Sequence, residues 1–336
     1  MRTNAKMPSE EPEEHLLCML RLQKGYISGK KLAKEIGIST SGISKRITIL
    51  RQYGYNIESN HRMGYRLAGE TDLPLPWELA KVLQTSFVGK DKIIYRQTTH
   101  STQNLAILLA EKDPSLDGIV IIAEQQTNGR GRQNRRWLSP RGGIWLSVVL
   151  RPRISASMIT LLPFAGALAV CDAIKKTTLL DAKLRWPNDV TINGKKVAGI
   201  LIDISMEGER INYAVIGIGI NANVDSSSIS SGLEKSIKVT SLSDELTHKT
   251  STLGLTKMIL ERLEYYYIEM KHCVPHTIIE EWKQNSDIIH QKVAVIQNNR
   301  TIQGIAADVN DDGSLLVRTD DCDNINVVAS DIHVRY

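Results

Sequence analysis

The spacing of apolar residues along the first part of the chain predicts a helix-turn-helix followed by a hairpin. Residues 15–25 (HLLCMLRLQKG) carry apolar side chains at helical spacing, and the helix is expected to end at Gly25. The next stretch, 28–54, predicts two short helices packed at an angle around a turn at Gly37. Residues 55–67 (YNIESNHRMGYRL) are then typical of a hairpin. We therefore expect a winged helix-turn-helix.

One face of the second short helix is expected to contact DNA. Ile43 and Ile47 should pack inward, which turns its polar positions outward toward a major groove, with Arg62 of the hairpin near the backbone. Charge supports this interpretation, because residues 15–67 carry ten Lys/Arg against two acidic residues (+8), leaving −3 for the rest. A helical hairpin used for protein contacts is the alternative. The candidate DNA-binding residues are Thr40, Ser41, Ser44, Lys45, Thr48 and Arg62.

After a proline-bearing connector (AGETDLPLPWE), strand-like and helix-like patterns are mixed. Asn193-Gly194 lies between two apolar runs and predicts a two-residue hairpin turn, and 225–232 (DSSSISSG) is expected to be a surface loop. Several adjacent strands with a few helices favour an α+β fold with a largely antiparallel or mixed sheet. The expected strands are 92–97, 118–125, 143–152 and 211–224, and the expected helices are 103–111, 157–175, 252–272 and 277–284.

Short alternating segments at the end of the chain (291–298, 300–309, 314–319 and 324–330) predict a small β-barrel. We therefore expect three domains: a winged helix-turn-helix DNA-binding domain at 1–70, a catalytic domain at 71–284 and the small β-barrel at 285–336.

Composition agrees with a globular cytoplasmic protein. Of the 336 residues, 42% are hydrophobic, enough for a substantial core. The longest nearly uncharged apolar run, Met158 to Cys171, is expected to be too short for a bilayer, and the polar start has no signal-peptide pattern. Four widely spaced cysteines predict buried thiols, without a disulfide or structural metal. No membrane partner is expected.

The segment GRGRQNRRW (129–137) places four arginines among two glycines and ends on Trp137. Gly129 and Gly131 would let the backbone approach a ligand, and guanidinium groups match phosphate or carboxylate geometry. The segment is neither a GxxxxGK[ST] phosphate loop nor a GxGxxG motif. An anion-binding loop and a merely solvated loop both fit it when it is considered alone.

Other segments change that balance. Together with STQN (101–104), Glu124 to Gln126, LRWPND (184–189), KKVAGILID (195–203) and GIGIN (217–221), the arginine-rich segment resembles the biotin protein ligase family. The N-terminal extension resembles the bifunctional subgroup that also represses biotin genes. The resemblance implies a biotin/lipoate ligase-like catalytic domain and an SH3-like C-terminal barrel.

The same resemblance implies two half-reactions. Biotin and ATP, with Mg²⁺, would form biotinyl-5′-AMP, and a lysine of a biotin carboxyl carrier protein would then accept biotin. Operator DNA and a ligand-promoted homodimer are the further partners that it implies. Two alternatives remain open at this point: a lipoate or octanoyl protein ligase, and a ligand-sensing transcription factor without catalysis.

Roles pass to individual residues only through the matched motifs. Arg132, Arg135 and Lys196 are the expected catalytic residues, whereas Lys195 should point to the opposite face of its strand. Direct metal ligands are left unknown. The expected biotin-binding residues are Ser101, Thr102, Gln103, Gln126, Arg130, Gly131, Arg132 and Lys196; the expected ATP-binding residues are Arg132, Arg135, Trp137, Asn188, Asp189 and Asn221.

Two positions depart from the family pattern. Asn134 stands where the arginine-rich motif commonly has glycine, and Asn128 where a small residue is usual. Asparagine tolerates a positive φ better than most residues, so we expect the turn to persist at Asn134 with altered loop closure.

Overall fold

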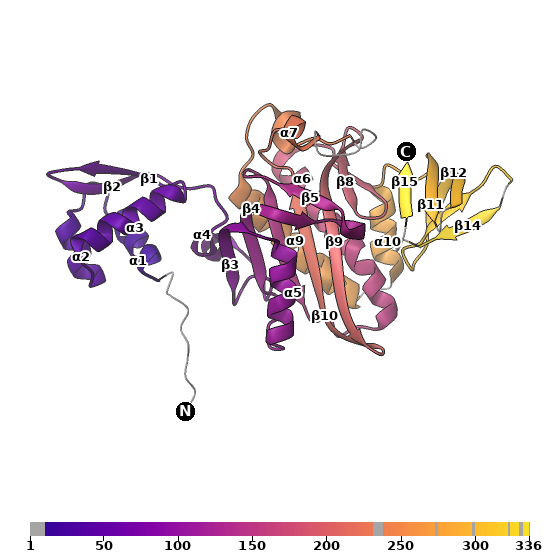
Figure 1. The fold of residues 1–336 in the computed structure, drawn as a ribbon, viewed down its shortest axis with the longest axis horizontal. Helices are drawn as coiled ribbons and strands as arrows, with labels where there is room; N and C mark the ends of the chain where they lie inside the picture. The colour runs from indigo at the N-terminus through magenta and orange to yellow at the C-terminus, as the bar shows by residue number, and fades with distance from the viewer. Residues whose placement is uncertain are drawn as a thin grey trace. The chain divides into compact units, whose positions relative to one another are not determined.

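The computed structural model describes residues 11–230, 238–272, 275–297, 300–321, 323–328 and 332–335, and the chain divides into two compact units after Leu73. The first unit holds three helices and a two-stranded antiparallel hairpin (Figure 1). Ser28 and Ser39 cap the second and third helices, and Gly37 ends the second with φ 77°. These elements are α1 (Glu11–Leu22), α2 (Gly29–Ile36), α3 (Thr40–Gln52), β1 (Asn56–Asn60) and β2 (Gly64–Gly69).

The predicted winged helix-turn-helix is confirmed. Ile43 and Ile47 are buried, as their spacing requires, and the turn lies at Gly37. The first helix ends at Leu22 and not at Gly25, so its predicted end was wrong by three residues. Helix ends are the least certain part of such a prediction, because the last turn lacks backbone partners.

The second unit is built on a mixed sheet, in agreement with the expected fold class. Its strands run in the order β3-β4-β6-β10-β9-β8-β7, with β5 paired to β4; β3 and β4 are parallel and the other neighbours antiparallel (Figure 1). The strands are β3 (Ile93–Thr99), β4 (Val120–Arg130), β5 (Arg136–Ser139), β6 (Ile144–Leu150), β7 (Lys183–Arg185), β8 (Asp189–Ile192), β9 (Lys195–Glu207) and β10 (Arg210–Ile220).

Helices cover both faces of this sheet. Val215 packs in one apolar cluster with Ala106 and Ala110 of α5 (Thr102–Lys112). The next residue, Ile216, faces the opposite side, where it lies close to Gly166 of α6 (Leu162–Thr178). Further helices are α4 (Pro76–Val82), α7 (Ser226–Ser230), α8 (Leu242–Leu246), α9 (Thr252–His272) and α10 (Pro275–Gln284), with 3₁₀ turns η1 (Arg132–Asn134) and η2 (Ala156–Leu161).

The apolar run near residue 160 is longer in the fold than its sequence suggested. Helical structure extends over Ser157–Thr178, 22 residues, which is long and apolar enough to cross a membrane. The expectation that the run is too short was therefore wrong, because the helix continues past Cys171 through charged residues. Most of its apolar stretch is buried inside the protein, so it is a core helix that packs against the sheet.

The C-terminal segment forms a five-stranded antiparallel sheet in the order β14-β13-β12-β11-β15. Alternate side chains such as Val293, Val295, Leu315 and Val317 are buried, as the sequence pattern predicts. The last strand was not predicted from the sequence. The strands are β11 (Lys292–Gln297), β12 (Arg300–Val309), β13 (Leu315–Arg318), β14 (Asn324–Val327) and β15 (Ile332–Arg335).

Three further expectations need correction. The proline-bearing connector contains the start of α4, since Pro76 occupies a first helical position that needs no backbone donor. The proposed surface loop 225–232 contains α7, whose Ile229 is buried; residues 231 and 232 lie outside the described part of the chain. Of the cysteines, Cys171 is buried as expected but Cys18 is exposed, and Cys273 and Cys322 also lie outside the described residues.

Candidate active site

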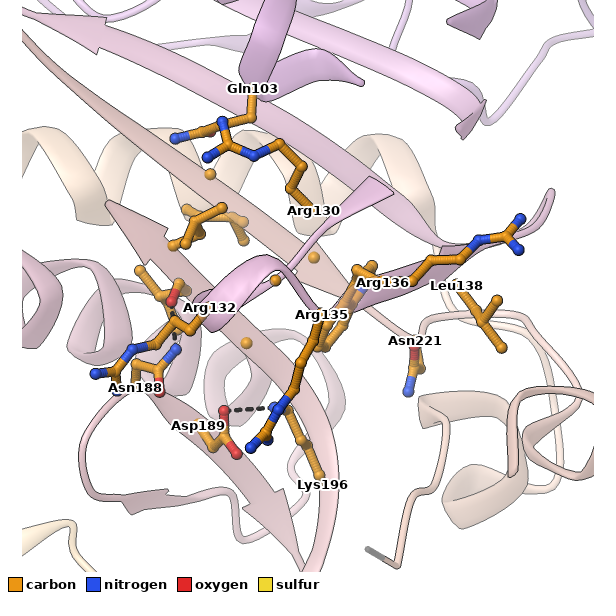
Figure 2. Close-up of a pocket in the computed structure, with 18 of the residues that line it drawn as sticks. Gln103, Arg130, Arg132, Arg135, Arg136, Leu138, Asn188, Asp189, Lys196 and Asn221 are labelled. Carbon is orange, nitrogen blue, oxygen red and sulfur yellow. Dashed lines mark hydrogen bonds and ion pairs between the residues drawn. The ribbon is translucent and has the colours of Figure 1, made fainter. Parts of the chain in front are cut away.

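A cavity of about 800 Å³ lies at the edge formed by β9, β10, the start of α5 and the turn between β4 and β5 (Figure 2). It brings together segments that are more than 100 residues apart in the sequence. All thirteen residues that the sequence assigned to biotin, ATP or catalysis line it: Ser101, Thr102, Gln103, Gln126, Arg130, Gly131, Arg132, Arg135, Trp137, Asn188, Asp189, Lys196 and Asn221.

The arginine-rich segment is a hairpin turn and not a long loop. Strand β4 continues to Arg130 and pairs with β5, so only residues 131–135, with η1 at their centre, separate the two. A side chain at Gly129 would collide with the Trp137 carbonyl, at 2.5 Å from its Cβ, whereas one at Gly131 would meet nothing closer than 3.4 Å. Gly129 therefore serves the hairpin itself, and Gly131 is the glycine that borders the cavity.

The left-handed residue of this turn is Gln133, with φ 54° and ψ 38°. The expectation that Asn134 would take that conformation was wrong by one position. The positive φ lies at the middle residue of a three-residue turn, and the sequence alone did not fix which residue is central. Asn128, at the second departure from the family pattern, donates from its backbone N–H to the carbonyl of His100 at 2.9 Å.

The four arginines of the turn have different partners. Arg130 forms an ion pair with Asp203 at 3.2 Å, and Arg132 donates to Asn188 Oδ1 at 3.3 Å. Arg135 donates to Gln133, and Arg136 donates to the Thr127 carbonyl. Figure 2 shows Arg135 directed toward the side of the cavity that holds Lys196 and Asp189, while Arg136 points away from it.

Trp137 lies against the backbone of two neighbouring strands. A Cβ at Gly199 of β9 would come within 2.9 Å of the indole, and one at Gly219 of β10 within 2.6 Å. The ammonium of Lys196 lies 5.0 Å from the ring centroid, within cation–π range. The glycines in KKVAGILID and GIGIN thus seat the tryptophan, which forms a flat apolar wall under the cationic part of the cavity.

Lys196 and Lys195 point to opposite sides of β9. The Lys196 ammonium lies 2.6 Å from Asp189 Oδ1 across the β8–β9 hairpin, inside the cavity. Lys195 pairs instead with Glu245, at 3.0 Å. The Asn193-Gly194 turn, with φ 50° and 72°, fixes this arrangement and is the two-residue turn that the sequence predicted.

The opposite end of the cavity is lined by a hydrogen-bonded set of neutral polar groups. Ser101 caps α5, and its neighbour Thr102 donates to Gln126 Oε1 from both N–H (2.7 Å) and hydroxyl (3.1 Å). Gln126 in turn donates to Ser139 at 2.8 Å. Ser147, which sequence reasoning did not select, places its hydroxyl 2.9 Å from both Gln103 Oε1 and Thr102 Oγ1.

Cations outnumber acids around this cavity. Lys238, also not selected from the sequence, lines it, and its backbone carbonyl accepts a hydrogen bond from the Lys196 N–H at 2.9 Å. Asp189 is the acidic lining residue, and Asn221, only 2% exposed, donates to the Thr240 carbonyl. Within the described ranges there is no group of three or more His, Cys, Asp or Glu able to hold a metal.

The segment before Asn188 is held by C-terminal residues. The Leu184 N–H donates to the Asn285 carbonyl, Arg185 pairs with Asp287 at 2.6 Å, and the buried indole of Trp186 donates to the Gly313 carbonyl at 3.0 Å. Three consecutive residues of LRWPND are thus fixed from outside the sheet. Sequence reasoning placed the C-terminal barrel but did not predict this contact.

In the first unit, all six candidate DNA-binding residues are exposed. Thr40, Ser41, Ser44, Lys45 and Thr48 lie on α3, and Arg62 lies in the β1–β2 turn. Arg66, by contrast, pairs with Glu58 at 2.7 Å and lies over the Tyr26 ring. The outward face of α3 is therefore open to a large partner.

A winged helix joined to a mixed-sheet body with a cationic cavity defines a biotin/lipoate-type protein ligase that carries a DNA-binding module. Family models agree in each part: residues 13–66 match an HTH domain, 94–221 the biotin/lipoate A/B protein ligase family, and 288–332 the biotin protein ligase C terminal domain.

Relatives that match most of the chain identify the family within this class of ligases. The chain is 34% identical over 299 residues to the bifunctional ligase/repressor BirA of Bacillus subtilis, covering 88% of this chain and 90% of the relative. It is 26% identical over 301 residues to BirA of Escherichia coli, with 88% and 89% covered. The chain therefore belongs to the family of bifunctional biotin protein ligases and repressors.

A solved structure supports the fold. The biotin protein ligase from Aquifex aeolicus in complex with biotin and ATP superposes with a TM-score of 0.62 at 24% identity, covering 73% of this chain and 99% of that one.

Proposed function

We propose that the cavity joins biotin to ATP as biotinyl-5′-AMP and that the protein then transfers biotin to a lysine of a carrier protein. The observation that carries this proposal is the convergence of Arg132, Arg135 and Lys196 on one cavity whose other end is neutral and polar. Such a division suits a ligand with a polar uncharged head and a carboxylate tail.

The neutral end would bind the biotin head. A ureido group both donates and accepts hydrogen bonds, and Ser101, Thr102, Gln103 and Gln126 offer hydroxyl and amide groups of both kinds. The backbone of Arg130 and Gly131 would add contacts along the tail. Lys196 would meet the tail carboxylate, since it is the lysine of β9 that faces the cavity.

The cationic end would align the reacting anions. A biotin carboxylate oxygen attacks the α-phosphorus of ATP, a P–O bond forms, and the bond to pyrophosphate breaks. Arg132, Arg135 and Lys196 would offset the negative charge that develops on the phosphoryl and leaving groups. The nucleotide would lie against Trp137, Asn188, Asp189 and Asn221. No protein nucleophile is required.

Magnesium would enter with the nucleotide. Asp189 is the lining carboxylate, and its Oδ1 is paired with Lys196, so this site fits a cation carried on the phosphates better than one held by several protein ligands. Mg²⁺ would neutralise part of the triphosphate charge. The arginines and Lys196 would position the nucleotide that carries it.

In the second half-reaction, the carrier lysine amine attacks the acyl carbon of the mixed anhydride and AMP leaves. The arginine-rich turn would act as a lid that keeps water from the intermediate. Asp189, beside Lys196, would orient the incoming amine.

Transcriptional repression would use the first unit. The exposed row on α3 and Arg62 would contact operator DNA, and a ligand-promoted dimer would match the two-fold symmetry of such a site. We assign the parts to 1–70, 71–284 and 285–336 and place the protein in the cytoplasm. If the biotinyl-AMP-bound protein showed no sequence-selective binding to its own upstream DNA, repression would no longer be part of this proposal.

Biotin-dependent exchange of pyrophosphate into ATP tests the first half-reaction. We expect exchange with biotin and none with lipoate. Exchange with lipoate alone would instead favour a lipoate ligase, and biotin binding without exchange would favour a sensor that performs no chemistry.

A further inference from the structure

The acidic residue at the end of KKVAGILID makes a contact that neither the motifs nor the proposed roles explain. Asp203 lies on β9 and does not line the cavity. Its carboxylate accepts from Arg130 through two N–H···O contacts, Nη2 to Oδ1 at 3.2 Å and Nη1 to Oδ2 at 3.3 Å. It also accepts from Gln103 Nε2 at 2.9 Å. One carboxylate thus joins three segments: the end of β4, the first turn of α5 and β9.

These contacts fix the direction of the Gln103 amide. Its Nε2 donates both to Asp203 and to the Val215 carbonyl (3.0 Å), so its Oε1 is left to accept from Ser147. A Cβ at Gly217 would stand 2.4 Å from that Oε1, so the glycine of GIGIN makes room for the amide. Through Ser147 the chain of hydrogen bonds continues to Thr102 and Gln126.

The same contacts also hold the Arg130 guanidinium. It is shared between Asp203 and Asn104 Oδ1 (3.0 Å), with a side-chain exposure of 30% against 28% for Asp203. Without the carboxylate, Arg130 would be able to swing to an incoming carboxylate or phosphate as a third arginine beside Arg132 and Arg135. The ion pair with Asp203 therefore gives Arg130 a structural role and keeps its guanidinium from the ligand.

We propose that Asp203 is a positioning residue for biotin: it orients Gln103 and restrains Arg130, and so sets the shape of the neutral end of the cavity and the base of the turn. This inference rests on the proposed biotin site. Neutralising the Asp203 carboxylate would leave the N–H donors of Gln103 and Arg130 facing an uncharged group, which is a weaker hydrogen-bond acceptor. Biotin affinity should fall while ATP-side groups stay in place.

The test measures biotin binding to the full chain by calorimetry, without ATP, for Asp203→Asn, Arg130→Gln and their double variant. Each single variant should weaken biotin binding, by about tenfold in Kd, and the double variant should bind no more weakly than Asp203→Asn alone, because Arg130 acts through the carboxylate that this variant has already neutralised. The ATP KM in pyrophosphate exchange should change by less than about threefold. Glu207→Gln, an exposed carboxylate at the end of the same strand, is the matched control.

Unchanged biotin affinity in both single variants would overturn the positioning role, as would a double variant about a hundredfold weaker, since independent losses multiply. Arg130→Gln keeps the test decisive if Asp203→Asn does not fold, because it breaks the same ion pair from a partly exposed side chain. A wild-type protein that binds no biotin would instead refute the site assignment itself, and this inference with it.

Discussion

The ammonium of Lys196 lies 2.6 Å from the carboxylate of Asp189 across the β8–β9 hairpin. The Lys196 ammonium also lies over the Trp137 ring, so a cation that would meet both the biotin carboxylate and the acyl phosphate is held in place before substrate arrives. Such preorganisation lowers the cost of aligning charge when the reaction occurs.

Lys196→Ala should slow adenylate formation by about 100-fold or more, because it removes a positioned charge from the transition state. Lys195→Ala is the matched control: its ammonium pairs with Glu245 on the other face of β9. Pyrophosphate exchange compares the two. Equal rates for both variants, each folded by circular dichroism, would contradict the role of Lys196.

Arg132→Ala should likewise impair adenylate formation by about 10- to 100-fold, with the loss mainly in kcat and the ATP KM. Arg136→Ala should lose far less, because the Arg136 side chain points away from the reacting groups and donates to a backbone carbonyl. Single-turnover formation of biotinyl-5′-AMP separates chemistry from binding. A larger loss for Arg136→Ala would reverse the proposed division within the turn.

Asp287→Ala should break the contact through which the C-terminal segment supports the nucleotide side of the cavity. It removes the 2.6 Å ion-pair partner of Arg185, which directly precedes Trp186, and the 2.8 Å hydrogen-bond acceptor of Thr191, which follows Asn188 by three residues. We expect a loss of about 1–3 kcal/mol in unfolding free energy. The KM for ATP should rise more than the KM for biotin. Urea unfolding and steady-state kinetics measure these. Stability loss without any change in the ATP KM would make the contact purely structural.

Glu264 of α9 predicts a pH-dependent contribution to stability. Burial favours its neutral form, but N–H groups of Ser86, Val88 and Phe87 donate to the carboxylate and outweigh burial, so the pKa lies below 4.5. A lowered native pKa stabilises the fold above the unfolded value and loses this contribution as the pH falls below about 4.5 through the native pKa. Glu264→Gln should therefore be less stable than wild type at pH 7, and the gap should shrink in acid.

Urea unfolding at pH 7 and pH 4 measures that gap, with Glu209→Gln in the β9–β10 turn as a control whose stability should follow wild type. A gap that stays constant between the two pH values would exclude ionisation of Glu264 as its source.

Lys45→Ala should weaken operator binding and reduce its salt dependence, because Lys45 lies exposed on α3. Lys90→Ala, an exposed lysine of the ligase unit, is the control. Gel-shift titrations at several salt concentrations provide the measurement. Identical affinities and salt slopes for both variants would place DNA contact elsewhere.

Local patterns in the sequence predicted the parts of the fold that they govern. Ile43 and Ile47 gave the buried face of α3, and Asn193-Gly194 gave the hairpin that aims Lys196 and Lys195 apart. Long-range partners could not be predicted in this way, because they depend on which strands become neighbours. Asp203 reaches Gln103 across 100 residues, and Trp186 reaches Gly313 across 127.

The turn of GRGRQNRRW shows the same limit at short range. Its composition indicated an anion-binding turn, but the positive φ falls at Gln133 and not at Asn134, and Gly129 is required by the hairpin's own backbone. Composition identifies which residues can serve a turn; the register of β4 against β5 decides which one does.

The most direct test of the account incubates the full chain with ATP, Mg²⁺, biotin and a biotin carboxyl carrier domain and then measures the mass of the carrier. We predict a gain equal to one biotinyl group, attached through an amide to a single lysine and dependent on both ATP and biotin. A carrier of unchanged mass, in the presence of a folded enzyme that binds biotin, would contradict the assignment of this cavity to biotin transfer.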